Sequence, residues 1–331
     1  MPTAAESSFY LPMVDITQWV NDPHSPAAQE VVAEVRKACK STGFFQIKGH
    51  GISPTLQKSV FEASARFFAL PADKKLELDC RKHAFRGYDA MGSQMYESGH
   101  DVPETLPDMK EGFFSAADLP PNHPWVVRGR WLQGSNIWPA PELLPYDKFR
   151  VHVEEYTREM LQLTRTVLSL IAATLPYGPH VFDELQANDP MWLFRLLRYP
   201  PTPKHQGKQA QFGSGEHTDF AAITLLLQDD HSGLEVQDCE TGNWVGVPPN
   251  KDVYVVNLGD IMSKITGGKY RSNMHRVLNK NTEDRYSVVF FFDGNLDYEL
   301  KPLDSVGESA ITVEDHVRAR MMGSYTPRKE S

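Results

Sequence analysis

The sequence predicts a mixed α+β protein whose strands form a sandwich or a barrel rather than a parallel sheet. Two observations carry this prediction. From about residue 146 to 174, apolar residues recur every three or four positions, which is the spacing of a long amphipathic helix. After residue 190 the apolar runs become short, rich in β-branched and aromatic residues, and separated by Gly, Pro, Asn or Asp, as in strands joined by turns. These runs cover residues 192–199, 221–228, 234–237, 244–247, 253–258, 275–278 and 286–292.

The remaining elements follow from local signals. Pro26 opens a helix with apolar residues at helical spacing, and Gly43 ends it. The segment 312–315 is similar to a capping box at the start of a last helix, which runs to residue 322. Residues 81–145 are rich in Pro, Gly and Trp with little periodicity, so we expect a loop region. We also expect a short strand within residues 8–16, a strand at 44–48, a helix from about 56 to 67 and a shorter helix at 180–187.

We expect these elements to form one compact domain in four segments. They are an N-terminal helical region at 1–125, supporting helices at 126–190, a strand-rich core at 191–295, and a C-terminal segment with a helix at 296–331. A chain of 331 residues can bury a sizeable core.

Composition narrows the class of partner. The net charge is -9 and no basic block is present, which argues against nucleic acid or an anionic membrane and favours a small-molecule substrate. The three cysteines are far apart and favour a reducing compartment. With neither a signal peptide nor a membrane-spanning stretch, the expected location is the cytoplasm, and the oligomeric state stays open.

A possible metal site begins at His217 and Asp219. On a strand, residues two apart point to the same side, so this pair would present an imidazole and a carboxylate together. They would be two of the three ligands of a facial iron triad, and His275 is the candidate for the third. Three protein ligands leave coordination positions open, and no cysteine lies near enough in sequence to close a structural zinc site. Taken alone, the pair fits a structural histidine beside a surface aspartate better.

A possible anion clamp lies on the last apolar strand. Arg285 and Ser287 share a face by the same alternation, and a guanidinium beside a hydroxyl suits a carboxylate. Tyr199, at the end of another strand, could add a third donor. Together they would hold the far carboxylate of a dicarboxylic co-substrate whose keto-acid end binds the metal.

These motifs resemble those of a known family, the isopenicillin N synthase-like iron(II)/2-oxoglutarate-dependent dioxygenases. The resemblance covers the chain from about residue 9 to 295, in the family's order. It is carried by residues 43–52, 108–114, 196–200, 217–219, 256–260, 275–277 and 285–287. One departure is Leu197, where plant members often have Asn.

The resemblance implies a double-stranded β-helix, or jelly roll, flanked by N-terminal helices and a long supporting helix. It implies iron ligands at His217, Asp219 and His275, and 2-oxoglutarate held by Tyr199, Arg285 and Ser287. The implied cofactors are Fe(II), 2-oxoglutarate and O2. The implied reaction oxidises an unactivated C–H bond, with release of succinate and CO2, by hydroxylation, desaturation or ring formation, as in secondary metabolism.

Strand alternation extends the prediction to substrate. If Tyr199 faces the cavity, so does Arg195, which would then meet either a substrate carboxylate or carbonyl, or a protein acid such as Glu216. Ser287 facing inward brings Phe291 inward as well. With Phe220, these positions resemble substrate contacts in fungal thymine hydroxylase, which suggests a ring-bearing or anionic substrate. The segment from Arg86 to Tyr88 is either pocket lining or turn chemistry with half-buried aromatics.

Two alternatives remain open at this point. Some members of the family use the arginine and serine clamp without 2-oxoglutarate, so the chain could be a 2-oxoglutarate-independent iron oxidase. A non-catalytic jelly-roll binding protein is the other alternative, although such a protein needs no carboxylate receptor beside its metal.

Overall fold

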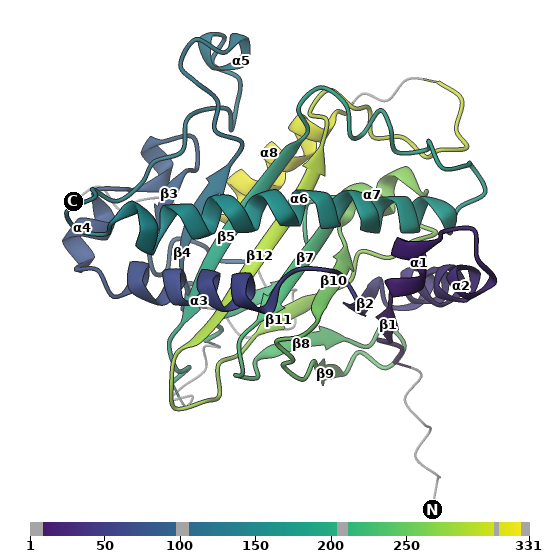
Figure 1. Ribbon diagram of the computed structural model, residues 1–331, viewed down its shortest axis with the longest axis horizontal. Helices are drawn as coiled ribbons and strands as arrows, with labels where there is room; N and C mark the ends of the chain where they lie inside the picture. The colour runs from purple at the N-terminus through teal and green to yellow at the C-terminus, as the bar shows by residue number, and fades with distance from the viewer. Residues whose placement is uncertain (1–8, 97–105, 204–210, 308–310, 326–331) are drawn as a thin grey trace, which may run out of the picture.

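The computed structural model describes residues 9–96, 106–203, 211–307 and 311–325, and within them the strands form two sheets (Figure 1). The larger sheet has eight strands in the order β1-β2-β10-β7-β12-β5-β4-β3. The smaller has four, in the order β6-β11-β8-β9. The strands of the larger sheet are β1 Met13–Asp15, β2 Phe44–Lys48, β3 Gly87–Asp89, β4 Glu111–Ala116, β5 Met191–Tyr199, β7 Ile223–Gln228, β10 Tyr254–Leu258 and β12 Arg285–Gly294. The strands of the smaller sheet are β6 Ser214–His217, β8 Leu234–Gln237, β9 Trp244–Gly246 and β11 His275–Val277.

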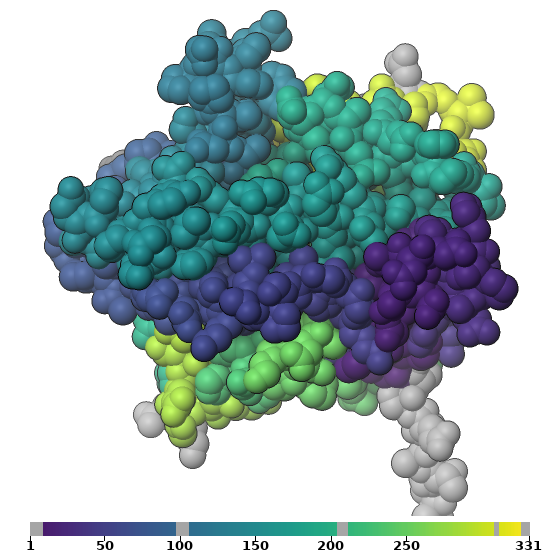
Figure 2. All heavy atoms as spheres, viewed as in Figure 1, coloured from purple at the N-terminus to yellow at the C-terminus, as the bar shows by residue number. Residues whose placement is uncertain are grey.

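Helices cover the outer face of the larger sheet. The long helix α6 crosses it beside α3, and both close that face in the space-filling view (Figures 1 and 2). Phe67 of α3 stacks on Phe149, the residue before α6, at 5.1 Å between ring centroids, and meets Phe113 of β4 at 4.8 Å. These aromatic contacts fasten the helical layer to the sheet. The helices are α1 Thr17–Asn21, α2 Pro26–Ser41, α3 Pro54–Phe68, α4 Ala72–Leu76, α5 Pro124–Val127, α6 Arg150–Ala173, α7 Asp260–Ile265 and α8 Val313–Ser324, with 3-10 turns η1 Cys80–Lys82 and η2 Tyr146–Lys148.

Local chemistry explains the two ends of α2. The Ser25 hydroxyl accepts a hydrogen bond from the Ala28 amide, and Pro26 occupies the first turn. At the other end Gly43 has a φ of +71°, and a Cβ there would lie 2.1 Å from the Arg271 carbonyl oxygen. Glycine therefore stops the helix and lets β2 begin beside that backbone.

The predicted mixed α+β class with a jelly-roll core is confirmed. The capping box at Thr312 is also confirmed, because its side chain and that of Asp315 bond to each other's backbone amides. The N-terminal region is not only helical, since it supplies β1 to β4 of the larger sheet. No helix among the described residues is both long and apolar enough to cross a membrane.

Two predicted elements differ from the structure. The expected loop region 81–145 contains strands β3 and β4 and helix α5. Residues 180–187 form successive turns rather than a helix. The Leu185 carbonyl accepts a hydrogen bond of 2.6 Å from the Asn295 amide just after β12. The Leu185 carbonyl is thus bonded to a distant segment and not to an amide one turn further along a helix.

Candidate active site

The fold brings the three predicted metal ligands together between the two sheets. His217 ends β6, His275 begins β11, and the two residues are paired across the smaller sheet. Asp219 lies two residues beyond β6, so the expectation that it shares the strand is wrong, although its carboxylate still faces both imidazoles. One ligand atom from each of the three residues lies within 4.8 Å of the other two.

Both imidazoles are oriented with Nε2 toward the centre. The Nδ1 atom of His217 lies 2.7 Å from the Gly215 carbonyl oxygen, and that of His275 lies 3.2 Å from the Asn273 carbonyl oxygen. A carbonyl only accepts, so Nδ1 carries the proton in each ring and the Nε2 lone pair is available to a metal. Burial, and then the neighbouring His275, hold the pKa of His217 well below its ordinary value, which keeps its ring neutral.

The Asp219 carboxylate is held from behind. Its Oδ2 atom accepts hydrogen bonds from Thr224 Oγ1 at 2.6 Å and Asn257 Nδ2 at 2.7 Å. Burial alone would raise the pKa of Asp219, but the two histidines and these two hydrogen bonds lower it below the ordinary value. Oδ1 is thus left facing the histidines, at 3.7 Å from His217 Nε2 and 3.6 Å from His275 Nε2. Two neutral imidazoles and one ionised carboxylate are the donor set of non-haem Fe(II) sites.

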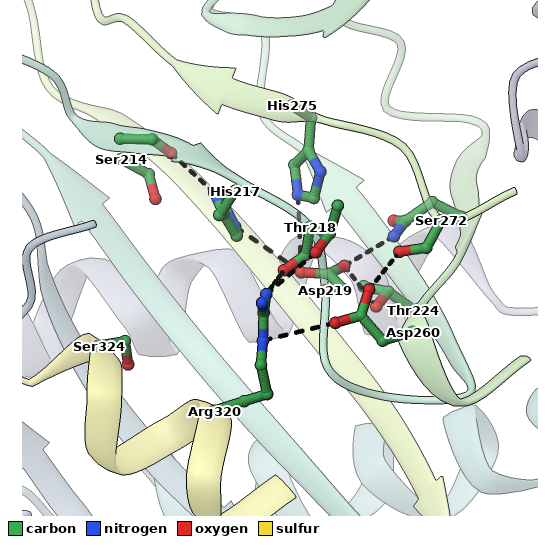
Figure 3. Close-up of polar contacts among 12 residues, drawn as sticks. Ser214, His217, Thr218, Asp219, Thr224, Asp260, Ser272, His275, Arg320 and Ser324 are labelled. Atoms are coloured by element: carbon green, nitrogen blue, oxygen red, sulfur yellow. Dashed lines mark hydrogen bonds and ion pairs between the residues drawn. The ribbon is translucent and has the colours of Figure 1, made fainter. Parts of the chain in front are cut away.

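Asp260 and Arg320 join the ligand-bearing segments to α8 (Figure 3). The Asp260 amide donates to the Asp219 carbonyl at 2.8 Å, and its side chain accepts from Ser272 Oγ at 2.8 Å, three residues before His275. Arg320 donates to the Thr218 carbonyl at 3.1 Å and lies 3.4 Å from Asp260 Oδ2. Gly259, and not Asp260, is the N-cap residue of α7.

Strand β6 is fixed by residues from the segment that leads into β4. The Gly215 amide donates to Asp108 Oδ1 at 2.8 Å, and Lys110 Nζ lies 2.7 Å from Asp108 Oδ2 and 2.8 Å from Ser214 Oγ. The Tyr96 ring also stacks on the His217 imidazole, with centroids 4.5 Å apart. These contacts hold His217 in place. The sequence did not predict Tyr96 as a site residue, because it belongs to no recognisable motif.

The predicted anion clamp is assembled at one end of the cavity. Arg285 and Tyr199 are directly paired between β12 and β5, and Ser287 follows on the same face. Arg285 is 1% exposed, and its Nη2 atom donates to Gln228 Oε1 at 2.9 Å. Among the described residues, Arg285 Nε, Arg285 Nη1 and Ser287 Oγ are buried without a hydrogen-bond partner. A buried guanidinium with unused donors fits the carboxylate of a ligand.

Gly233 makes room for this guanidinium. A Cβ at Gly233 would lie 2.9 Å from Arg285 Cδ and 3.1 Å from Arg285 Nε. A larger residue would therefore displace the arginine.

The strand alternation predicted for the cavity agrees with its lining. Leu197 and Arg195 line it from β5, and Val289 and Phe291 line it from β12, with Phe220 at the end nearest α8. Arg198, between Leu197 and Tyr199, points away from the cavity and pairs with Glu111 at 2.6 Å and Asp284 at 2.7 Å.

Arg195 is paired with a protein acid. Its Nη2 atom forms an ion pair with Asp89, and its Nη1 atom donates to Gln94 Oε1 at 2.9 Å. The suggested partner Glu216 is wrong, because Glu216 pairs with Arg276 at 2.8 Å. The Arg195 charge is therefore already matched inside the protein.

The pocket-lining alternative for Arg86 and Tyr88 is wrong. Arg86 is fully buried and donates to the carbonyls of Ala84 and Leu132, both at 2.8 Å. The Tyr88 hydroxyl donates to Glu111 at 2.6 Å. Neither residue lines the cavity. The Arg86 guanidinium instead binds loop carbonyls, and the Tyr88 hydroxyl binds Glu111 of β4.

Residues 191–294 match the family described as the 2OG-Fe(II) oxygenase superfamily, and residues 11–141 match the N-terminal region of the non-haem dioxygenase in morphine synthesis. A 2-oxoglutarate-dependent dioxygenase, citB of Monascus ruber, is 60% identical, with 98% of each chain covered. The chain belongs to the 2OG-Fe(II) oxygenase superfamily. It is thus an oxidoreductase that uses Fe(II) and 2-oxoglutarate to oxidise a small molecule.

Two further relatives of this dioxygenase agree with the assignment. Clavatol oxidase claD of Penicillium crustosum is 59% identical, with 98% of this chain and 99% of that one covered. A full-length Neurospora crassa protein, crystallised in complex with alpha-KG, superposes with a TM-score of 0.79 at 25% identity, covering 97% of this chain and 98% of that one.

Proposed function

We propose that three side chains bind Fe(II) and three others bind the far carboxylate of 2-oxoglutarate. The metal ligands are His217, Asp219 and His275, and the co-substrate residues are Tyr199, Arg285 and Ser287. The observation that carries this proposal is the two buried donor nitrogens of Arg285 without a hydrogen-bond partner among the described residues, in a cavity that also holds the triad. It favours a 2-oxoglutarate-dependent enzyme over a binding protein, because this buried charge needs an anionic ligand. The 60% identity to a 2-oxoglutarate-dependent dioxygenase favours it over a 2-oxoglutarate-independent oxidase.

When bound together, Fe(II), 2-oxoglutarate and O2 supply the oxidation of an unactivated C–H bond, with one oxygen atom going to succinate and CO2 leaving. The chain's own residues hold the metal ligands and the co-substrate in position. Asn257 and Thr224 hold Asp219 ionised, the Gly215 and Asn273 carbonyls fix the imidazole tautomers, and Arg285 sets the direction of the co-substrate.

The substrate fits the wall away from the clamp. Phe220 and Phe291 offer aromatic faces there, and Leu193 adds an apolar surface. We propose a ring-bearing small molecule of the kind oxidised in secondary metabolism, because these aromatic and apolar side chains suit a ring. An anionic substrate is not favoured, because Asp89 already neutralises Arg195.

The proposal is tested by measuring succinate formed from 2-oxoglutarate with Fe(II) and O2 across a metabolite library. Substrates should raise succinate release above the substrate-free level, and Asp219→Ala should abolish the increase. Unchanged iron-dependent turnover in Asp219→Ala would show that the triad is misassigned.

A further inference from the structure

A second carboxyl group, that of Asp293, faces the active-site cavity. Asp293 lies near the end of β12, on the cavity-lining face that carries Ser287, Val289 and Phe291. The pairing of β12 with β5 shifts register between Phe292 and Gly294, so Asp293 sits at a bulge. Bulges beside active sites commonly redirect one side chain. Alternation along β12 continues to Asp293, so the sequence contained a signal for this residue.

The Asp293 carboxyl has no polar partner among the residues that the structure describes. The residue is 5% exposed, yet no hydrogen bond or ion pair from the described part of the chain reaches its side chain. Burial, and then the charge of Asp219, raise its pKa to about 7. A buried acid without a partner weakens the fold unless something else in the cavity satisfies it.

The surroundings restrict what can satisfy this acid. Val317 and Met321 of α8 and Phe291 line the same cavity with apolar surface. Arg195 is paired with Asp89, and it lies opposite Val289, four residues from Asp293, or about 13 Å along the strand. The acid therefore lies beside apolar side chains and the Asp219 carboxylate, away from that guanidinium.

The charges around the cavity also disfavour a cationic ligand. The guanidinium of Arg320 lies 4.8 Å from the Phe220 ring centroid and so already covers that face. An anionic group at Asp293 would meet a carboxylate. A neutral hydrogen-bond donor avoids both conflicts.

We infer that Asp293 accepts a hydrogen bond from a hydroxyl or N–H group of a neutral, ring-bearing substrate and so determines which carbon of that substrate faces the metal site. This inference rests on the proposed function, since it concerns the substrate of the same cavity. It makes Asp293 a specificity-determining residue.

The first test is thermal unfolding of Asp293→Leu and Asp293→Asn, without substrate. If the acid is kept for a ligand, Asp293→Leu removes a carboxyl that the described part of the protein does not pair, and Tm of Asp293→Leu should rise by about 2 °C or more. A lower Tm in both variants would show that Asp293 supports the fold and would overturn the inference.

The second test uses matched methylbenzenes that carry a hydroxyl, methoxy, carboxylate or ammonium group at the 3 or 4 position. Their binding is measured by calorimetry with Mn(II) and 2-oxoglutarate present, and succinate release is measured separately with Fe(II). The phenols should bind about tenfold or more tightly than their methyl ethers, as expected for one buried hydrogen bond. Asp293→Leu should abolish this preference, and Asp293→Asn should keep part of it because its amide oxygen still accepts.

The control is Asp297→Asn, which changes a nearby aspartate that pairs with Arg130 at 2.6 Å and does not line the cavity. It should keep the wild-type preference. The inference is overturned if no phenol binds, if Asp293→Leu keeps the preference, or if carboxylate or ammonium probes bind best. A separate titration of the Mn(II) protein with 2-oxoglutarate distinguishes the two failures. Absent 2-oxoglutarate binding would refute the proposed function, whereas normal 2-oxoglutarate binding with indifferent probes would refute only the role of Asp293.

Discussion

Asn257 is not one of the proposed metal ligands, but it holds one of them, Asp219, in position. Its amide donates to the outer oxygen of Asp219 from β10, and it leaves Oδ1 turned to the histidines. It belongs to the segment 256–260 that carried part of the family resemblance, but no role for it could be predicted from its neighbours in the chain. Thr224 supplies the other hydrogen bond. Together they orient the carboxylate ligand.

Asn257→Leu should therefore weaken metal binding about 10- to 100-fold while the protein stays folded. Leucine has a similar size but cannot donate to Asp219. Fe(II) affinity can be measured anaerobically against a competing chelator, with Asn243→Leu on an exposed turn as the control. Equal affinities for wild type and Asn257→Leu would mean that Thr224 alone orients Asp219.

The Arg195 and Asp89 pair makes a second prediction at the scale of residues. Because both groups are buried, Arg195→Leu leaves an uncompensated charge and should reduce the free energy of unfolding by about 3–5 kcal/mol. The double variant Arg195→Leu/Asp89→Leu should recover most of this loss, as urea unfolding can show. Additive losses in the double variant would contradict the pairing.

At the scale of elements, β5 and β12 explain why alternation predicted so much of the cavity. They pair in register from Arg285 with Tyr199 to Phe292 with Trp192. Once one residue is known to face the cavity, alternation therefore shows which other residues of both strands face it. Strand alternation failed as a guide where the backbone is not a regular strand. Asp219 lies beyond β6, and the 180–187 segment gives a carbonyl to the end of β12. Contacts between distant segments, such as Tyr96 on His217, have no local sequence signature.

The contact between α8 and the loop after β6 depends on Arg320. Arg320→Met keeps an apolar stem near Phe220 but loses two hydrogen bonds to Thr218, at 3.1 and 3.0 Å. Each such bond contributes about 1 kcal/mol, so amide hydrogen exchange in α8 should become faster. Arg318→Met, at an exposed position of the same helix, serves as the control. Unchanged exchange in Arg320→Met would show that packing alone holds α8.

At the scale of the whole molecule, the N-terminal region and the core are joined by a buried charge cluster. Glu111 of β4 contacts Lys75 at 2.7 Å, Arg198 at 2.6 Å and the Tyr88 hydroxyl at 2.6 Å. Burial would raise the pKa of Glu111, but these three hydrogen bonds lower it. The segment 108–114 was recognised in the sequence, but Lys75 could not be assigned to it because it is distant in the chain.

This cluster predicts a dependence of stability on pH. A carboxyl group whose pKa is lowered by folding stabilises the protein above its unfolded pKa, about 4.3 for Glu, and loses that contribution as pH falls through the folded-state pKa. Glu111→Gln should unfold more easily than wild type at pH 7, with a difference that narrows in acid. Urea midpoints from pH 3 to 7 measure this. A difference that is constant with pH would exclude Glu111 ionisation as the cause.

The most direct measurement is anaerobic titration of the Fe(II) protein with 2-oxoglutarate, comparing wild type with Arg285→Leu and the surface control Arg318→Leu. Since Arg285 offers two unused buried donors, its loss should weaken 2-oxoglutarate binding by about 30-fold or more, with Fe(II) binding retained. Equal 2-oxoglutarate affinity in wild type and Arg285→Leu would contradict the assignment of this cavity as the co-substrate site.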